Sequence, residues 1–362
     1  QELDDWAALG VEGHFHAKNP WMPYHEFLTE SMANVVGARP SEVVVMNSLT
    51  VNLHLLMVSF YRPTKDRFKI IIEADAFPSD RYAVISQIKF HGYDPADALI
   101  ELRSKSGHPV IPTEEILETI EKEGDQVALV MLGGVNYYTG QTFEMDKITK
   151  AGHAKGCVVG FDLAHGAGNL HLQLHDWNVD FACWCSYKYL NSGPGGLSGI
   201  FVHERHGNDF ELPRFAGWWG HNKANRFKMP PYFEPMPGAE GWQLSNPPIL
   251  ALAALRASLE IFEEVGMAAL RKKSEALTGY FDWLVKAKNH DDNIRIITPS
   301  DPKQRGCQLS LQTMKNGKAI FDRLTARGVI ADWREPDVIR LAPVPLYNSF
   351  VDVWEFVDIL TE

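Results

Sequence analysis

The sequence contains little that indicates nucleic acid, a membrane or export. Basic side chains are outnumbered, with 35 lysines and arginines against 46 acidic residues and a net charge of −11, so no extended surface for nucleic acid or anionic lipid is expected. The longest apolar runs, such as residues 127–132, fall far short of the roughly 20 residues that span a bilayer. The chain begins acidic, without the basic and apolar segments of a signal peptide. We therefore expect a cytoplasmic protein that binds neither nucleic acid nor membrane.

Cysteine is also scarce. The four cysteines are Cys157, Cys183, Cys185 and Cys307, and three of them lie in apolar runs typical of strands, where a free thiol behaves as a small hydrophobe. Cys183 and Cys185 share one face of a predicted strand, but no second pair and no His-x-x-x-His motif completes a zinc site. The sequence therefore predicts no metal site and suits a reducing compartment.

Short apolar runs alternate with helical patterns, and no internal repeat or low-complexity tract interrupts them. This alternation predicts an α/β protein whose large domain has three layers, a mainly parallel sheet with helices on both faces. The expected strands are residues 42–46, 68–74, 127–132, 156–161, 179–185 and 200–202, and the expected helices include residues 25–36, 48–61 and 145–155. Residues 13–21 contain too many turn formers for a regular element.

The chain changes character after residue 202. Residues 203–248 are rich in Gly, Pro, Trp and Arg, and such a long irregular segment is usually functional. A helical pattern over residues 249–265 follows, and the domain boundary is placed inside it, giving domains of residues 1–250 and 251–362. The second domain is predicted to be small and α+β. Its expected helices are residues 267–288, 317–327 and from 349, and its expected strands lie near residues 293–298, 306–313 and 338–341.

An acid and a lysine follow two neighbouring predicted strands. Asp162 ends the run that begins at residue 156, and Lys188 follows the run of residues 179–185. Ligands of open α/β sheets bind outside the carboxyl ends of the strands. Pyridoxal phosphate needs a lysine amine for a Schiff base and a carboxylate to keep its pyridine nitrogen protonated. The two residues suit this cofactor, although a helix-capping acid and a surface lysine would give the same pattern.

Two further strand ends could serve such a cofactor. The run of residues 42–46 leads into a helix that Ser48 or Thr50 would cap, and the free N–H groups of a helix start favour a phosphate. Phe77 follows the run of residues 68–74 and could lie flat against a cofactor ring. Many such turns bind nothing, and Phe77 could equally be a core residue.

Arg340 and His14 are the remaining candidates. Arg340 lies on an otherwise apolar strand and needs an anionic partner, which would be either a substrate carboxylate, bound through two hydrogen bonds, or an internal salt bridge. His14 lies in the irregular stretch near the N-terminus and could be a ligand, but loop histidines are more often plain surface residues.

Five stretches carry a resemblance to a known family. They are residues 47–54 (NSLTVNLH), 77–80 (FPSD), 160–165 (GFDLAH), 187–191 (YKYLN) and 340–343 (RLAP). Together with the runs around Trp184 and Asn246, they resemble the kynureninases, which are pyridoxal-phosphate enzymes with the aspartate aminotransferase fold. The resemblance spans essentially the whole chain.

The resemblance implies a role for each matching residue. Lys188 forms the Schiff base and moves the Cα proton, Asp162 pairs with the pyridine nitrogen, and Phe77 stacks on the ring. The other implied contacts are Leu49, Thr50 and Tyr187 at the phosphate, Pro78, Ser79, Asp80 and His165 around the ring, Trp218 and Asn246 across the interface of a homodimer, and Arg340 at the substrate carboxylate.

The implied reaction is hydrolytic cleavage of the Cβ–Cγ bond of L-kynurenine or L-3-hydroxykynurenine, which gives alanine and an anthranilate in tryptophan degradation and NAD synthesis. Tyr187 is the candidate proton donor or acceptor near the substrate carbonyl. His14 and Asn246, with Ser245 beside the latter, match residues that favour the 3-hydroxylated substrate in some family members. We therefore expect this preference here.

Some features depart from the family pattern or leave alternatives open. An N-terminal segment with a Gly-Asn-Ser-Leu-Gly motif is not found, and Gly133 stands where some relatives have serine near the phosphate. An aminotransferase or a cysteine desulfurase of the same fold would also use the aspartate and the lysine, but a desulfurase needs a cysteine in a mobile loop, and Cys307 lies in a strand-like run. A cofactor-free binding protein would need both residues, and Arg340, to be structural.

Overall fold

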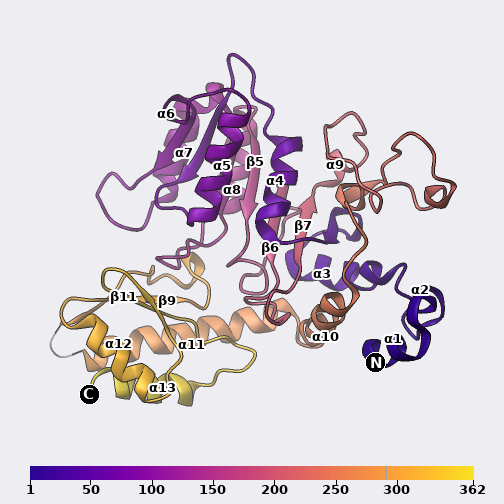
Figure 1. Cartoon of the computed structure of the whole chain (residues 1–362). Coiled ribbons are helices and arrows are strands. Elements are labelled where there is room, and N and C mark those ends of the chain that lie inside the picture. The colour runs from indigo at the N-terminus through magenta and orange to yellow at the C-terminus, as the bar shows by residue number, and fades with distance from the viewer. Residues whose placement is uncertain (290–291) are drawn as a thin grey trace.

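A seven-stranded sheet forms the centre of the large domain in the computed structural model, which describes residues 1–289 and 292–362 (Figure 1). Its strands lie in the order β1-β7-β6-β5-β4-β2-β3. Their bounds are β1 (Val43–Val45), β2 (Lys69–Glu73), β3 (Leu99–Leu102), β4 (Val127–Gly133), β5 (Val158–Asp162), β6 (Phe181–Cys185) and β7 (Ser198–Val202). Strands β6, β5, β4, β2 and β3 are parallel, whereas β7 is antiparallel to β6 and to β1. The prediction of a mainly parallel sheet is confirmed.

The sheet is covered on both faces, which explains why its strands are apolar throughout. In β4, Leu129 and Met131 belong to one buried cluster, and Val130 and Leu132 belong to another, as the period of two in a strand requires. The first cluster includes side chains of α4 (Leu49–Phe60) and α5 (Pro78–Phe90), and the second includes side chains of α7 (Thr113–Glu123) and α8 (Met145–Ala154). The large domain therefore has three layers.

A second, antiparallel sheet of four strands forms the small domain, in the order β10-β11-β9-β8. Its strands are β8 (Ile294–Ile296), β9 (Leu309–Thr313), β10 (Asp332–Arg334) and β11 (Val338–Leu341), and its helices are α11 (Met267–Lys288), α12 (Gly317–Ala326) and α13 (Phe350–Leu360). These elements share one buried cluster. The expected α+β character of this part of the chain agrees with this arrangement.

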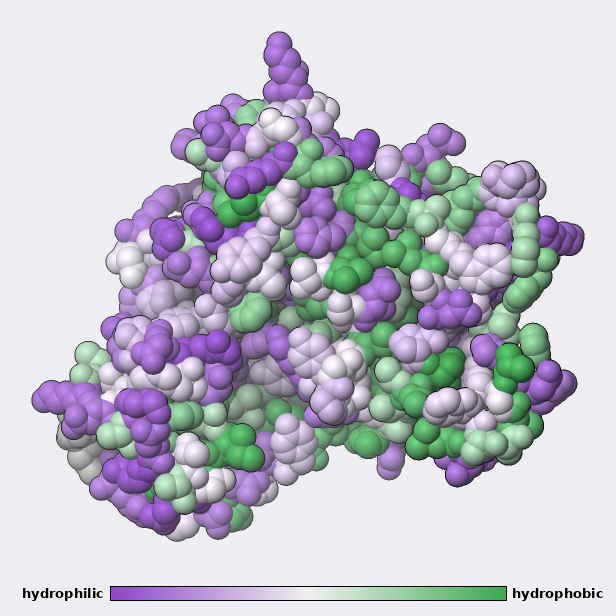
Figure 2. Space-filling view, in the orientation of Figure 1, coloured by the Kyte–Doolittle hydropathy of each residue, from purple (hydrophilic) through white to green (hydrophobic). Residues whose placement is uncertain are grey.

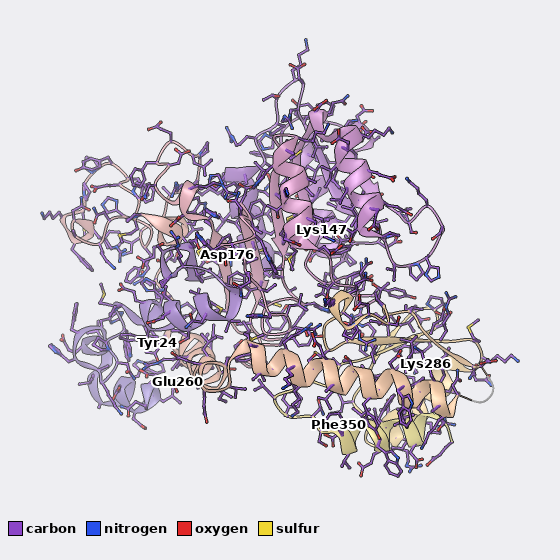
Figure 3. The ribbon with its side chains drawn as sticks, turned by 180° about the vertical axis from the view of Figure 1, so that it is seen from behind. Tyr24, Lys147, Asp176, Glu260, Lys286 and Phe350 are labelled. Carbon is purple, nitrogen blue, oxygen red and sulfur yellow. The ribbon has the colours of Figure 1, made fainter. Side chains whose placement is uncertain are left out.

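Helices α10 (Ile249–Val265) and α11 connect the two parts. Side chains of α10 and of the beginning of α11, up to Leu270, belong to the core of the large domain, whereas Leu277 and later residues of α11 belong to the core of the small one. The reverse view shows α11 running along the base of the molecule towards Lys286, above α13, which begins at Phe350 (Figure 3). The boundary between residues 250 and 251 stays a prediction.

The structure differs from the sequence-based expectations at several short elements. Residues 13–21 were expected to be irregular, which is wrong for Gly13–His16, the short helix α2, whereas residues 17–21 contain no helix or strand. The pattern over residues 25–36 divides into a 3-10 turn and α3 (Thr29–Val36). Strands β3 and β10 were not predicted, since both are short edge strands with polar residues. The other short helices are α1 (Glu2–Leu9), α6 (Pro95–Ala98) and α9 (Glu204–Gly207).

The long segment after α9 has little regular structure, as its composition predicts. Between α9 and α10 it contains only 3-10 turns, at Arg226–Lys228 and Gly238–Trp242, and it forms extended loops on the side of the molecule that also carries α1 and α2 (Figure 1). Within the described residues, no helix combines the length and the apolar character that crossing a membrane requires.

Candidate active site

A cavity of about 260 Å³ lies at the carboxyl ends of the parallel strands. It is bounded by the strand ends of β2, β4 and β5, by the segment after β6, and by the starts of α4 and α5, the position expected for a ligand in an open α/β sheet. The predicted site residues that line it are Leu49, Thr50, Phe77, Ser79, Asp80, Asp162, His165, Tyr187 and Lys188. Pro78 is the first residue of α5, between two of these residues.

Two carboxyl groups meet at one side of the cavity. Asp162 is the last residue of β5 and is 5% exposed, and its Oδ1 accepts a hydrogen bond of 2.7 Å from the Ala164 N–H. Its side chain is also hydrogen-bonded to that of Asp80. Burial raises the pKa of Asp162, and burial together with the charge of Asp162 raises the pKa of Asp80 well above its usual range. Such a pair shares a proton readily, and one negative charge remains to pair with a cationic ring nitrogen.

An amine and an aromatic ring face each other across the same cavity. The Lys188 Nζ lies 5.7 Å from the centre of the Phe77 ring. Phe77 precedes α5 and is 40% exposed, so the core-residue alternative for it is wrong. Its ring packs edge-on against Tyr137, with centroids 5.2 Å apart. The exposed face of Phe77 is therefore available for stacking with a planar ligand.

The start of α4 closes the opposite end of the cavity. Ser48 is the N-cap residue, but its side chain makes no capping hydrogen bond, so the expectation of a hydroxyl cap was wrong. Asn47 has a positive φ of 51° and donates to Asn52 Oδ1, which fixes the turn that leads into the helix. The backbone N–H groups at Leu49 and Thr50 are left for an anion, at the positive end of the helix dipole.

Tyr187 and His165 are both neutral at physiological pH. Partial burial, with the neighbouring Cys185, raises the pKa of Tyr187 to about 12. Burial, with the positive charges of Lys188 and Arg340, lowers the pKa of His165 to about 3. The Nδ1 atom of His165 is buried and has no hydrogen-bond partner in the part of the chain that the structure describes. The phenol can therefore donate a proton, and the imidazole offers a flat, uncharged surface.

Arg340, on β11 of the small domain, contacts Tyr137, which lines the cavity, but does not line the cavity itself. It donates from Nε to Asp332 Oδ2 at 2.6 Å, and from Nη1 to the carbonyl oxygen of Tyr137, whose residue lines the cavity. The Arg340 side chain is only 12% exposed. The internal salt bridge that was the alternative for Arg340 is therefore present, with Asp332 as the partner. The substrate role of Arg340 stays a prediction, supported by its position beside Tyr137.

Four predicted residues lie outside this cavity. His14 is on α2, where its Nδ1 lies 2.9 Å from the carbonyl oxygen of Val11. Trp218, Ser245 and Asn246 lie in the segment between α9 and α10, and all three are exposed. Within one chain, none of the four lines the cavity.

The structure adds residues that sequence reasoning missed. Glu73, the last residue of β2, and Tyr137 both line the cavity. An acid at a strand end was the signal that identified Asp162, and Glu73 carries the same signal. Gly133 also lines the cavity and lies against Glu73, because an added Cβ would approach the Glu73 Oε1 to 2.9 Å.

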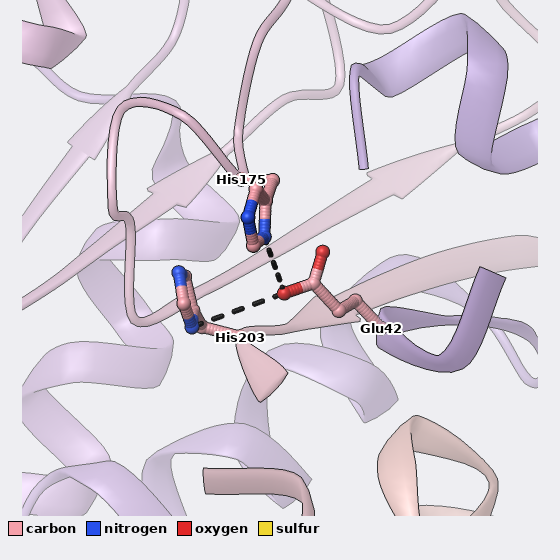
Figure 4. Close-up of side chains that lie close together, drawn as sticks. All are labelled: Glu42, His175 and His203. Carbon is pink, nitrogen blue, oxygen red and sulfur yellow. Dashed lines mark hydrogen bonds and ion pairs between the residues drawn. The ribbon is translucent and has the colours of Figure 1, made fainter. Parts of the chain in front are cut away.

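A group of potential metal ligands lies elsewhere, at Glu42, His175 and His203 (Figure 4). The Glu42 Oε1 is 2.9 Å from His175 Nδ1 and 3.8 Å from His203 Nδ1. The two imidazoles stack, with centroids 5.0 Å apart and planes within 17°, so their in-plane lone pairs run side by side and do not converge on one ion. Glu42 also accepts the backbone N–H groups of Arg39 and Glu204. Through these hydrogen bonds, the cluster connects loops that are distant in the sequence.

Comparisons with known proteins agree with the geometry. Residues 270–360 match the family model described as the kynureninase C-terminal domain. The kynureninase of Myxococcus xanthus is 63% identical over 360 residues, which are 99% of this chain and 84% of that protein, and the kynureninase of Koribacter versatilis is 62% identical over 357 residues, with the same coverage.

Solved structures with the same fold are much more distant in sequence. The apo cysteine desulfurase from Thermococcus onnurineus superposes with a TM-score of 0.80 at 16% identity, over 99% of this chain and 90% of that one. A cystine C-S lyase, described in complex with cysteine persulfide, has a TM-score of 0.80 at 17% identity, over 99% and 92% of the two chains. They confirm the predicted aspartate aminotransferase fold. The identity to the curated relatives shows the family: the chain belongs to the kynureninases.

Proposed function

We propose that the protein is a pyridoxal-phosphate-dependent hydrolase that cleaves the Cβ–Cγ bond of L-kynurenine or its 3-hydroxy form, releasing L-alanine and an anthranilate. The observation that carries the proposal is the convergence of Lys188, Asp162 and the start of α4 on one cavity, in a chain of this family. These residues fit pyridoxal phosphate, because the cavity offers an amine for the aldehyde, a carboxyl group for the pyridine nitrogen, an aromatic face for the ring and a helix start for the phosphate. All four cysteines are free and buried, which suits a cytoplasmic enzyme.

Separate residues hold the separate parts of the cofactor. Lys188 would bind the aldehyde carbon, Asp162 with Asp80 would bind the pyridine nitrogen, and the face of Phe77 would support the ring. The start of α4, at Leu49 and Thr50, receives the phosphate. His165 lies beside the ring as an uncharged surface, consistent with its lowered pKa.

The chain's own residues then carry the proton transfers. When bound, pyridoxal phosphate withdraws electrons from the substrate Cα. The Lys188 amine takes the proton from this carbon and later returns it. The Tyr187 phenol, which is protonated near neutral pH, donates a proton to the oxygen of the γ-carbonyl while water adds to Cγ, and the water proton returns to the phenolate. The hydrated Cγ then leaves as the aryl carboxylic acid, and the electron pair of the broken Cβ–Cγ bond stays with Cβ. Arg340 binds the substrate α-carboxylate in place of Asp332, through the two-pronged geometry of its guanidinium.

A second copy of the chain would complete the site. His14, Trp218, Ser245 and Asn246 lie outside the cavity within one chain. The same part of the molecule exposes large apolar side chains at Leu3, Val11, Phe15, Phe210, Phe215, Phe227, Met229 and Tyr232, and Figure 2 shows apolar surface on this side. Exposed apolar surface of this kind is typical of an interface. In the proposed homodimer, Trp218 and Asn246 extend into the cavity of the other subunit.

The same residues support a substrate preference. His14, Ser245 and Asn246 are hydrogen-bonding side chains that would surround the aryl end of the substrate, so an added ring hydroxyl gains partners there. The expected preference is for 3-hydroxykynurenine. Measurement of kcat/KM for both substrates tests it, and an equal or higher value for kynurenine would contradict it.

A desulfurase on this fold would need an exposed, reactive thiol. Cys307 is fully buried, and burial raises the pKa of its thiol to about 12. The remaining cysteines are also buried. Thiolate chemistry at these positions is therefore disfavoured, which supports carbon–carbon bond cleavage over desulfuration.

An absorbance spectrum between about 300 and 500 nm, before and after addition of 3-hydroxykynurenine, tests the proposed function. We expect an absorption band at about 420 nm that shifts when 3-hydroxykynurenine is added, with release of alanine. A shifted band without alanine would contradict the hydrolytic reaction and indicate a transaminase-like one. No band after addition of pyridoxal phosphate would overturn the cofactor assignment.

A further inference from the structure

Glu73 is a buried acid in the cavity to which the proposed mechanism gives no role. It ends β2, it is 4% exposed, and its carboxyl group lines the cavity together with Asp80 and Asp162. Its two oxygens lie 3.3 and 3.2 Å from one donor, the backbone nitrogen of Gly133. These distances are long for a hydrogen bond, so this contact compensates poorly for a full negative charge on a buried carboxyl group.

Gly133 connects Glu73 to the acid pair. Gly133 is the register partner of Asp162 where β4 pairs with β5, and the next residue, Gly134, donates its N–H to the Asp162 carbonyl oxygen at 2.7 Å. The backbone nitrogen that Glu73 contacts therefore belongs to the strand end that holds Asp162 in place. A Cβ added at Gly133 would lie only 2.9 Å from the Glu73 Oε1, so the two residues are in close contact.

The charges around the cavity favour a neutral Glu73. Three carboxyl groups line the cavity, and among the residues that line it Lys188 is the only lysine or arginine. On the β3 side, Leu102 is the register partner of Glu73, and the following Arg103 pairs with Asp75 at 2.9 Å. Burial, with the charge of Asp162, raises the pKa of Glu73 to about 7.

We propose that Glu73 is a positioning residue of the cofactor site, which accepts a hydrogen bond from the Gly133 N–H and so keeps Asp162 against the pyridine nitrogen. The inference rests on the proposed function, because it requires the pyridine ring beside Asp162. Glu73 itself does not touch the reacting atoms. It determines where the strand end carrying Asp162 lies.

Three variants test this role through cofactor binding by the apoprotein. Glu73→Gln keeps the oxygen that accepts the Gly133 N–H and cannot ionise, whereas Glu73→Ala removes the acceptor. We expect the Kd for pyridoxal phosphate and the position of its absorption band to be unchanged in Glu73→Gln, and the Kd to rise about tenfold in Glu73→Ala. The matched control is Glu101→Gln on β3, an acid paired with Arg81 outside the cavity lining, and it should leave both readouts unchanged.

A double-mutant cycle with Gly133→Ala tests the connection. The added methyl group should raise the Kd in the wild-type background and have a smaller effect in the Glu73→Ala background, because the group that it meets is then gone. Thermal melting of each apoprotein shows whether the variants fold, and if Gly133→Ala does not fold, the comparison of Glu73→Gln with Glu73→Ala decides alone.

The outcomes separate this inference from the proposed function. If the wild type gives no cofactor band, the proposed function fails. If the wild type gives the band and Glu73→Gln loses as much affinity as Glu73→Ala, Glu73 acts through its charge and the positioning role is wrong. Additive effects in the double-mutant cycle would likewise overturn the connection through Gly133.

Discussion

Lys188 Nζ lies 5.7 Å from the centre of the Phe77 ring, although β6 and β2, the strands that precede these residues, are separated in the sheet by β5 and β4. The parallel order of these strands brings their carboxyl ends to the same edge, so side chains far apart in sequence face one cavity. The separation leaves room for a flat ring attached at the lysine and supported by the phenylalanine. The acid pair at Asp162 and Asp80 lies in the same cavity.

Substitution of Lys188 by alanine should abolish covalent attachment of the cofactor. Without the amine no Schiff base forms and the Cα proton has no acceptor, so we expect kcat to fall about a thousandfold or more. Mass spectrometry after borohydride reduction of the holoenzyme measures the attachment. Lys147→Ala on α8, an exposed lysine paired with Glu144, is the control and should keep the adduct. An adduct that persists in Lys188→Ala would assign the Schiff base to another lysine.

Replacement of Tyr187 by phenylalanine removes the proton donor and keeps the ring. Since the phenol is protonated at neutral pH and its proton is lost with the hydroxyl group, kcat for kynurenine should fall about a hundredfold or more, with a smaller change in KM. Steady-state kinetics measure both constants. Tyr82→Phe, a 67% exposed tyrosine on α5, should match the wild type. A loss confined to KM would show that Tyr187 binds a ligand without transferring a proton.

The sequence predicts those site residues whose position follows from the end of a single strand. Asp162 and Lys188 follow apolar runs, and the parallel topology places both at the same edge, so their convergence could be predicted. The position of Phe77 was open because an aromatic residue at a strand end is compatible with both core and cavity, and only its 40% exposure decides between them. Asp332 could not be paired with Arg340 because β10 is a short polar edge strand without an apolar pattern.

Asp180 should make stability depend on acid pH. It is buried, and it accepts from His153 and His206 at 2.8 Å, from the Val159 N–H at 2.7 Å and from Arg205. Burial alone would raise the pKa of Asp180, but the hydrogen bonds from His153 and His206 and the charge of Arg205 lower it below its usual range. A lowered pKa stabilises the folded state above the unfolded-state value of about 3.9, and this contribution is lost as pH falls below it.

Asp180→Asn should therefore lower the free energy of unfolding by about 3 kcal/mol near pH 7. The difference in Tm from the wild type should shrink below about pH 4, because the Asp180 carboxyl group then becomes protonated in the unfolded state, which lowers the stability of the wild type. Thermal melting of both proteins between about pH 7 and about pH 3 measures this difference in Tm. The exposed Asp176→Asn, in the loop before β6 (Figure 3), is the control. A difference that stays constant with pH would show that the contribution of Asp180 does not depend on its charge.

Arg340→Lys tests the assignment of the substrate carboxylate. The guanidinium contacts a single oxygen of Asp332, Oδ2, through Nε and Nη2. Its planar fork of donors could bind both oxygens of a free carboxylate, which a lysine cannot do. We expect KM for kynurenine to rise about tenfold, with a smaller change in kcat. Arg327→Lys, an exposed arginine paired with Glu362, is the control. If Arg340 served only the internal salt bridge, Arg340→Lys and Asp332→Asn would lower Tm alike and leave KM unchanged, so kinetics and melting of the two variants decide between the roles.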